Sequence, residues 1–420
     1  MSDLLVLTSQ CNRTAVPVLD QPQLLYVLAE LMPGENLSRR RLPLNFALVL
    51  DRSGSMAGEK LQTMKEAVKN VIDQLEPEDV ISIITFESRT ELTYPAQRAV
   101  DKSALKKAIE KIRNGGGTNM APALKAGLRS VSQHLGENRV NRIILLTDGE
   151  ATDREDDSRA IADEAGNIGA PIICLGFGQE WNEDFLIDLA DRSVLAPPGS
   201  RLGMVDYIPT PKHAKRIFQE VYQSMQVVAQ QVTLTVRMVQ GIEARRVWQV
   251  TPMIRDISQT AIQGRAIQVQ IGQLERTGVV YLIELMLPPR SAGIVRFAQA
   301  DVTFLTPEQG QMRQTADLIV EYSHDPLANE KLNQRVMNVV EKIQAFRLQT
   351  QALEDAQAGD IDHATRKLRQ AVTILLAQGE SELAGQMQRE ADQLESSGMV
   401  SSEGKKTILL TSRKTVRLSG

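Results

Sequence analysis

The sequence has little of several features that mark particular classes of protein. It contains two cysteines in 420 residues, Cys11 and Cys174, which are too few for a disulfide framework. Aromatic residues make up 4% of the chain, which argues against an aromatic-lined pocket for sugars or bases. Lys and Arg number 48 against 52 Asp and Glu, so the net charge is −4. A nucleic-acid-binding protein normally shows a basic excess, and we therefore expect no nucleic-acid partner.

Long apolar runs and targeting signals are also missing. No apolar stretch approaches the roughly 18 residues that cross a membrane. The segment from Met1 to Leu7 lacks the basic region and the small-residue cleavage site of a signal peptide. The sequence therefore predicts a cytoplasmic protein without a membrane span.

What the sequence does contain is an alternation of strand and helix patterns in its central part. Short apolar runs lie at residues 45–50, 80–85, 142–147 and 171–175, and three of them are rich in Ile and Val without polar alternation. Such runs are typical of parallel strands covered on both faces. Helical patterns separate them, which favours a doubly wound, Rossmann-like α/β sheet whose ligands bind at the carboxyl ends of the strands.

The flanking segments have a different period. Apolar and polar residues alternate over residues 25–31, 232–238, 267–271 and 281–287, which is typical of antiparallel strands. Neither flank is large enough to close a core alone. We therefore predict that residues 1–41 and 229–322 form one antiparallel β-sandwich, into which an α/β domain of residues 42–228 is inserted.

A third pattern begins near residue 325. Apolar residues run at 4-3 spacing from Leu332 to Phe346, and two further helical patterns follow. The sequence predicts a helical hairpin or bundle over residues 323–396. The polar and basic residues 397–420 are expected to form a flexible basic tail.

Three short motifs follow or lie between the predicted strands of the α/β domain. They are Asp51-Arg-Ser53-Gly-Ser55, Gly115-Gly-Gly-Thr118 and Thr147-Asp148-Gly149. Their ligands are hard oxygens without sulfur or imidazole, which suits Mg²⁺ or Mn²⁺ ahead of Ca²⁺. The two carboxylates would balance the charge of a divalent ion, and the ion could accept one further carboxylate from outside the chain.

No general base accompanies these motifs. The four histidines, His134, His213, His324 and His363, all lie away from them in the sequence. We therefore expect a binding protein and no enzyme. A metal-dependent hydrolase is the alternative from another class, and a strand-to-helix turn capped by serines is the alternative for the first motif alone.

The three motifs together resemble the metal-ion-dependent adhesion site (MIDAS) of von Willebrand factor type A (VWA) domains, over about residues 43–226. The flanking segments are similar to bacterial proteins of this type. The resemblance implies that Ser53, Ser55 and Thr118 coordinate the metal directly. It also implies that Asp51 and Asp148 act mainly through water.

The resemblance predicts a Mg²⁺-dependent protein–protein interaction scaffold that binds an acidic residue of a partner. An alternative is a regulatory or assembly subunit that works with a separate MoxR- or chelatase-like AAA+ ATPase, since the chain carries no nucleotide motif. The oligomeric state is left open.

The basic tail contains two candidate phosphosites. Thr407 and Thr415 each have a leucine at the +3 position and lie among Lys and Arg. A mobile threonine in this context resembles the phosphothreonine ligands of forkhead-associated (FHA) domains. The alternative is an edge strand or a solvated tail without such a partner.

Overall fold

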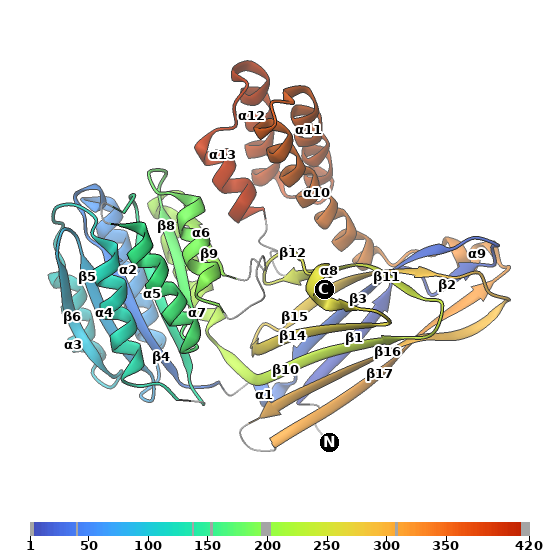
Figure 1. Ribbon diagram of the computed structural model, residues 1–420, viewed down its shortest axis with the longest axis horizontal. Coiled ribbons are helices and arrows are strands. Elements are labelled where there is room, and N and C mark those ends of the chain that lie inside the picture. The colour runs from blue at the N-terminus through green and yellow to red at the C-terminus, as the bar shows by residue number, and fades with distance from the viewer. Residues whose placement is uncertain are drawn as a thin grey trace. The chain divides into compact units, whose positions relative to one another are not determined.

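The computed structural model describes residues 4–38, 41–136, 138–151, 154–194, 203–306 and 310–412 (Figure 1). The chain forms two compact units. One contains residues 41–227, and the other combines residues 1–40 with residues 228–420. The first unit is therefore inserted in the second.

The inserted unit is built on a six-stranded sheet in the order β6-β5-β4-β7-β8-β9. β6 is antiparallel to β5, and the other neighbouring strands are parallel. The strands are β4 (Leu44–Asp51), β5 (Val80–Phe86), β6 (Thr90–Arg98), β7 (Val140–Thr147), β8 (Ile172–Phe177) and β9 (Met204–Ile208). The helices are η1 (Gly54–Met56), α2 (Glu59–Gln74), α3 (Lys102–Lys111), α4 (Met120–Ser132), α5 (Glu155–Asn167), α6 (Glu183–Arg192) and α7 (Pro211–Ser224).

Both faces of this sheet are covered, which explains the uninterrupted apolar runs in its sequence. Every residue of β4 is buried. Phe46, Leu48 and Leu50 share a core with the apolar sides of α2, α3 and α7. On the opposite face, a β-carbon at Gly127 of α4 would come within 2.8 Å of Val49. The predicted doubly wound α/β fold is thus confirmed.

The sequence predicted the four central strands but neither edge strand. β6 contains Pro95, and most of its residues are exposed or half-buried, so it lacks a continuous apolar run. β9 has only five residues. Both strands are short or polar because an edge strand has only one neighbour to pack against.

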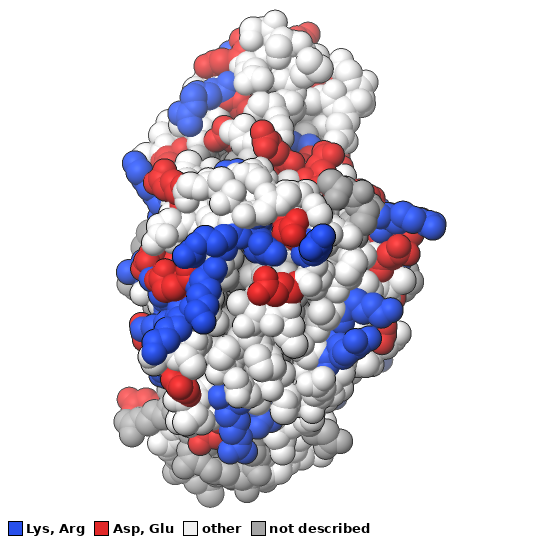
Figure 2. All heavy atoms as spheres, turned by 90° about the vertical axis from the view of Figure 1, so that its left-hand side faces the viewer, with Lys and Arg blue, Asp and Glu red and all other residues white. Residues whose placement is uncertain are grey.

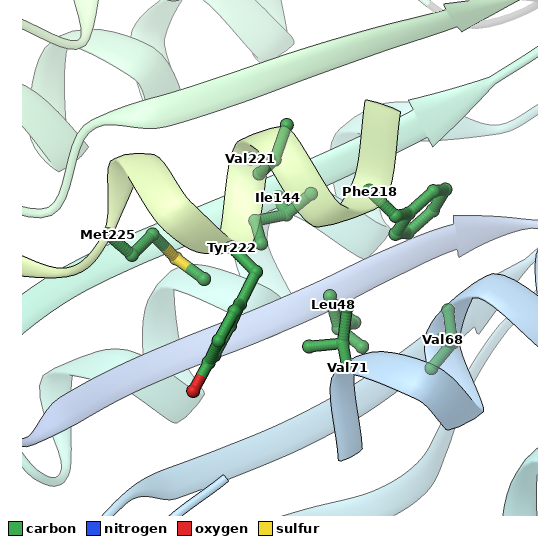
Figure 3. Close-up of a pocket in the computed structure, with 8 residues that line it drawn as sticks. All are labelled: Leu48, Val68, Val71, Ile144, Phe218, Val221, Tyr222 and Met225. Atoms are coloured by element: carbon green, nitrogen blue, oxygen red, sulfur yellow. The ribbon is translucent and has the colours of Figure 1, made fainter. Parts of the chain in front are cut away.

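A small cavity of about 10 Å³ lies between α7, α2 and the sheet (Figure 3). Its lining is Leu48, Val68, Val71, Ile144, Phe218, Val221, Tyr222 and Met225. The space is near the lower limit for a single water, and the lining exposes no polar surface to it. The cavity is therefore a packing gap and no ligand site.

The second unit contains two sheets that pack face to face. One has the order β1-β3-β15-β11-β12 and the other the order β13-β14-β10-β16-β17-β2. Their strands are β1 (Leu5–Cys11), β2 (Ala15–Pro17), β3 (Gln23–Pro33), β10 (Val227–Met238), β11 (Glu243–Thr251), β12 (Arg255–Asp256), β13 (Ile262–Gln263), β14 (Ala266–Glu275), β15 (Val279–Leu287), β16 (Gly293–Thr306) and β17 (Gly310–Ser323). Two short helices, α1 (Glu35–Ser38) and α8 (Ser258–Ala261), lie between strands.

Strands from both ends of the chain complete this sandwich. β3 pairs with β15 over nine residues, from Val279 opposite Leu31 to Leu287 opposite Gln23. The short β2 pairs with β17, and this pair is parallel. One core joins Leu25 and Val27 to side chains of β10, β15 and β16, so the predicted β-sandwich with its inserted domain is confirmed.

Helices follow the sandwich, as predicted. They are α9 (Pro326–Glu330), α10 (Gln334–Gln357), α11 (Ile361–Ala377), α12 (Ser381–Ser397), α13 (Ser402–Lys406) and a π-helical turn, η2 (Thr407–Thr411). The first half of α10 places Val336, Val339 and Ile343 against the sheet that contains β3 and β15. Its second half packs against α11 and α12. The predicted 4-3 seam of α10 therefore meets a sheet over much of its length, and Leu332 precedes the helix.

The prediction of a flexible tail from residue 397 is wrong for residues 397–412. α13 and η2 pack against the bundle, where Thr407, Ile408 and Leu410 are 4%, 1% and 3% exposed. Glu390 of α12 explains this order, because its carboxylate accepts hydrogen bonds from the backbone nitrogen (2.5 Å) and hydroxyl (2.7 Å) of Ser401. Thr415 lies outside the described residues.

The surface of the inserted unit around β6 and α3 carries basic and acidic side chains side by side (Figure 2). Lys69 contacts Glu66 and Glu110, and Lys106 contacts Asp73. These two lysines are each paired with acidic side chains, so their charge is balanced locally. Within the described ranges, the structure holds no helix with the length and apolarity that a bilayer crossing demands.

Candidate functional site

The three motifs meet at the carboxyl edge of the α/β sheet. Asp51 is the last residue of β4, and Asp148 directly follows β7, its neighbour in the sheet. From β4 the chain continues to β5 on one side, whereas β7 leads to β8 on the other. Ligands of open α/β sheets bind at such a switch in strand order. The fold therefore places both carboxylates where a ligand site is expected.

The hydroxyls of the first motif lie around one oxygen of Asp148. Ser55 Oγ donates to Asp148 Oδ1 at 2.6 Å, Ser53 Oγ lies 3.5 Å from the same oxygen, and the two hydroxyl oxygens are 3.1 Å apart. Neighbouring ligands of an octahedral Mg²⁺ at 2.0–2.1 Å are about 3 Å apart. The observed oxygen spacing fits adjacent positions of such an ion.

Thr118 closes the third side of this group. A β-carbon at Gly149 would lie 3.7 Å from Thr118 Oγ1 and 4.0 Å from Ser55 Oγ. Gly149 thus borders the space on which the hydroxyls converge, and a larger residue there would reach toward them. Thr118 lies just ahead of α4, whose N-cap is Asn119.

Hydrogen bonds between the loops hold the first two motifs together. Gly54 donates from its backbone to the Gly116 carbonyl at 2.9 Å, and Gly115 donates to the Arg52 carbonyl at 2.7 Å. The Glu87 carboxylate accepts from the Gly116 backbone at 3.2 Å. Hydrogen bonds from the backbone of Ser88 and Gly116 lower the pKa of Glu87.

This close approach explains the glycines of the second motif. A β-carbon at Gly115 would come within 2.6 Å of the Glu87 side chain, and one at Gly116 would come within 2.8 Å of Ser88 Oγ. The loop can therefore reach Arg52 only without side chains at these positions.

Asp51 is wholly buried beneath the hydroxyls. Its Oδ1 accepts from the Ser53 backbone at 2.8 Å, and its Oδ2 accepts from the Thr147 hydroxyl at 2.6 Å. Burial raises the pKa of Asp51, and the charge of Asp148 acts in the same direction, whereas the hydrogen bonds from Thr147 and Ser53 oppose this rise. A buried carboxylate of this kind is suited to a nearby cation.

The five predicted metal-site residues, Asp51, Ser53, Ser55, Thr118 and Asp148, thus lie together. Ser55 is exposed, while both aspartates have no exposed surface and Ser53 and Thr118 are buried. The alternative of serine caps does not fit this geometry, because Ser53 makes no capping hydrogen bond at η1 and the N-cap of α2 is Gly58. Hydroxyl and carboxylate oxygens without imidazole or thiolate fit a hard divalent cation.

Sequence reasoning assigned no role to Thr147 of the third motif, and it missed Lys60. Thr147 supplies a hydrogen bond to Asp51, and Lys60 of α2 places its ammonium 2.5 Å from Asp148 Oδ2. Lys60 had a signal in the sequence, because a cation in the first turn of a helix is unfavourable unless an acid lies near it.

The family model of the von Willebrand factor type A domain matches residues 45–198. A second family model, described as a Sll0103-like C-terminal alpha-helical domain, matches residues 334–418. The "uncharacterized protein sll0103" of Synechocystis is 29% identical over 438 residues, which cover 99% of this chain and 97% of that protein. Human inter-alpha-trypsin inhibitor heavy chain H4 is 33% identical over 160 residues, which cover 36% of this chain and 17% of that protein.

Solved structures show the same fold. A von Willebrand factor type A protein from Catenulispora acidiphila has a TM-score of 0.71 at 20% identity, over 98% of this chain and 97% of its own. The ArnB paralog VWA2 from Sulfolobus acidocaldarius has a TM-score of 0.52 at 16% identity, over 98% of both chains. The inserted α/β unit of this protein is a von Willebrand factor type A domain, a member of a family of domains that commonly mediate protein–protein interactions.

Proposed function

We propose that this protein is a scaffold whose VWA domain binds Mg²⁺ and, through the ion, an acidic side chain of a partner protein. Ser53, Ser55 and Thr118 would hold the ion directly, and Asp51 and Asp148 would act mainly through water. The observation that carries this proposal is the 3.1 Å spacing of the two serine hydroxyls beside a buried carboxylate pair. The bound ion would supply an electrophilic centre with a position open to an outside carboxylate.

Affinity capture from lysate of the source cell tests this function. With Mg²⁺ present, the wild-type protein is expected to retain a specific partner that EDTA releases, because the ion forms the link between the two proteins. Mass spectrometry would identify the partner, and a variant with Thr118→Ala would serve as a second way to weaken the site. Equal capture with Mg²⁺ and with EDTA would contradict the proposal.

Metal binding should also depend on pH. The raised pKa of Asp51 means that a proton competes with a cation at a higher pH than for an ordinary carboxyl group near pH 4. We expect the Mn²⁺ affinity to fall as the pH is lowered toward the pKa of Asp51. Metal binding should then release protons from this carboxyl group. Calorimetric titrations in two buffers of different ionisation enthalpy measure that proton release, and an affinity that stays constant down to pH 4 would refute it.

The proposal includes a cytoplasmic, non-enzymatic protein of the bacterial type. Two of the four histidines have partners of their own, since His213 bonds to Thr210 and His363 to Asp360. Neither partner belongs to the five-residue metal site, so neither of these contacts supplies a base to it. An AAA+ ATPase of the MoxR or chelatase kind is one class of partner to look for among the captured proteins.

Binding of an FHA-domain partner would require Thr407 or Thr415 to be accessible to a kinase. Thr407 is 4% exposed within η2, so a kinase could reach its hydroxyl only after residues 400–412 leave the bundle. Mass spectrometry after co-expression with a cognate kinase would test phosphorylation at Thr407 and at Thr415.

A further inference from the structure

Lys60 is the cation of the candidate metal site. It belongs to the first turn of α2, and its Nζ lies 2.5 Å from Asp148 Oδ2. The lysine side chain is 28% exposed, whereas the aspartate side chain has no exposed surface. The ammonium therefore stands at the border between solvent and a buried carboxylate.

The two oxygens of Asp148 face different partners. Oδ1 accepts from Ser55 at 2.6 Å on the side of the hydroxyls, and Oδ2 meets Lys60. The Lys60 side chain also lies close to the turn after β8, where a β-carbon at Gly178 would be 3.6 Å from its Nζ. Lys60 thus occupies one oxygen of Asp148 and leaves the other directed at the hydroxyls.

The position of Lys60 is unfavourable for the helix alone. The N-terminal end of a helix carries a partial positive charge, which repels a cation in the first turn. The N-cap, Gly58, has no side chain, and Glu59 at the first helical position supplies the acidic charge that this end of the helix favours. The ion pair with Asp148 is the contact in the described structure that accounts for a lysine here.

Arg52, inside the first motif, has its own acids. The guanidinium of Arg52 lies 3.6 Å from Glu87 and 3.5 Å from Glu91, so its charge is balanced outside the site. Lys60 has Asp148 as its partner, and the charge of the site must therefore include it.

We propose that Lys60 sets the net charge of the metal site and thereby its selectivity for a single carboxylate. Asp51, Asp148 and Lys60 together carry one negative charge, so the site with a divalent ion carries one positive charge. One partner carboxylate brings that charge to zero. Without Lys60 the loaded site would be neutral and would attract an anion less. This inference rests on the proposed function and adds a residue that tunes it.

The same charge opposes the metal. Lys60 repels a divalent ion that approaches Asp148, and in the absence of metal it compensates a buried carboxylate. Lys60 therefore weakens metal binding and strengthens the capture of an anion by the loaded site. A residue that only positions Asp148 would strengthen both.

The first claim, that Lys60 weakens metal binding, is tested by titration with Mn²⁺ alone. Electron paramagnetic resonance measures the free ion at each step of the titration. Lys60→Met is expected to bind Mn²⁺ at least about tenfold more tightly than the wild type, because a unit charge within several ångströms of the ion is removed. Lys60→Arg keeps the charge and should bind like the wild type. Lys69→Met removes a lysine from the same helix that pairs with Glu66 and Glu110, and it should have no effect.

Acetate is the probe for the second claim, that Lys60 strengthens the capture of an anion by the metal-loaded site. With the Mn²⁺ site saturated in each protein, acetate should displace water from the ion, which lowers the relaxation rate of water protons. Lys60→Met is expected to need several-fold more acetate than the wild type, Lys60→Arg or Lys69→Met. Circular dichroism would confirm that each variant is folded.

The outcomes separate this inference from the proposed function. If the wild type binds Mn²⁺ and Lys60→Met binds it equally or more weakly, Lys60 does not set the charge of the site, and the inference is overturned. An unchanged acetate response in Lys60→Met overturns it as well. If no protein in the set binds Mn²⁺, the proposed function itself fails, and the role of Lys60 fails with it.

Discussion

Replacing Asp51 by asparagine is expected to weaken Mn²⁺ binding about 100-fold while leaving the metal-free protein folded. The substitution removes one of the two buried negative charges of the site, and loss of a group that orients a metal through water typically costs about 10–100-fold in affinity. Asparagine keeps the hydrogen-bonding shape, because its oxygen can accept from Ser53 and its amide can donate to Thr147. Titration with Mn²⁺ measures the loss.

The metal-free Asp51→Asn protein should be at least as stable as the wild type at neutral pH. The pKa of Asp51 is raised in the folded state, so its cost in stability is absent below the unfolded pKa, grows as the pH rises above that value, and is complete above the folded pKa. The asparagine carries no such cost. Thermal unfolding at one fixed Mn²⁺ concentration would show a metal-dependent rise for the wild type and for the control Asp73→Asn, but a much smaller rise for Asp51→Asn.

Asp51→Ala is a poorer test of the site than Asp51→Asn. Asp51 is fully buried, and alanine would leave the Thr147 hydroxyl and the Ser53 amide without their acceptor. Each such loss costs about 1–3 kcal/mol. A full Mn²⁺ response in Asp51→Asn would contradict the assignment of this carboxylate to the site.

Replacing Gly404 by alanine is expected to release residues 400–412 from the helical bundle. A β-carbon at this position would overlap the Glu390 carboxylate, which is itself held by Ser401. Overpacking of this kind typically costs about 1–3 kcal/mol. Because α13 has only five residues, we expect the cost to appear as local opening of this segment and not as unfolding of the bundle.

Hydrogen exchange followed by mass spectrometry measures that opening peptide by peptide. Gly385→Ala is the matched control, since Gly385 lies within α12 and a β-carbon there meets nothing closer than 3.8 Å. Alanine in a helix interior is favoured over glycine by up to about 1 kcal/mol, so this control should exchange more slowly or not differ. Unchanged protection of residues 400–412 in Gly404→Ala would mean that Glu390 does not hold the segment.

The fold could be predicted from the sequence where burial leaves a recognisable pattern, which is either an uninterrupted apolar run or an alternation of apolar and polar residues. β4 and β7 are buried along most of their length, and their uninterrupted apolar runs identified them. β6 has a proline and an exposed face, so no period marks it. The sandwich was predictable because alternating residues of strands such as β3 and β15 face one core.

The segment after residue 397 shows where local composition misleads. Its lysines suggested a solvated tail, yet Ile408 and Leu410 have less than one twentieth of their surface exposed. The residue that fixes them, Glu390, lies 11 positions before Ser401 and on another helix. The sequence around Glu390 and the sequence around Ser401 give no indication that these two residues are in contact.

The candidate site was predictable in its oxygens but not in its charge. Asp51, Ser53, Ser55, Thr118 and Asp148 stand out because three spaced motifs gather at one edge of the sheet. Lys60 lies in the first turn of a helix whose sequence otherwise describes a buried apolar face, so its position is only a weak signal. The 2.5 Å distance from its Nζ to Asp148 Oδ2 is what assigns its role. Counting the charges of a metal site from its motifs alone therefore omits this cation.

The pairing of β3 with β15 has a consequence for synthesis of the chain on the ribosome. Residues 23–33 emerge early but find their partner, residues 279–287, only after the whole VWA domain has been translated. All strands of the inserted domain have been translated well before residues 279–287, so this domain can complete its core first. The early strands must wait with their apolar side chains uncovered, so the nascent protein passes through a stage in which a finished domain is tethered to an unfinished one.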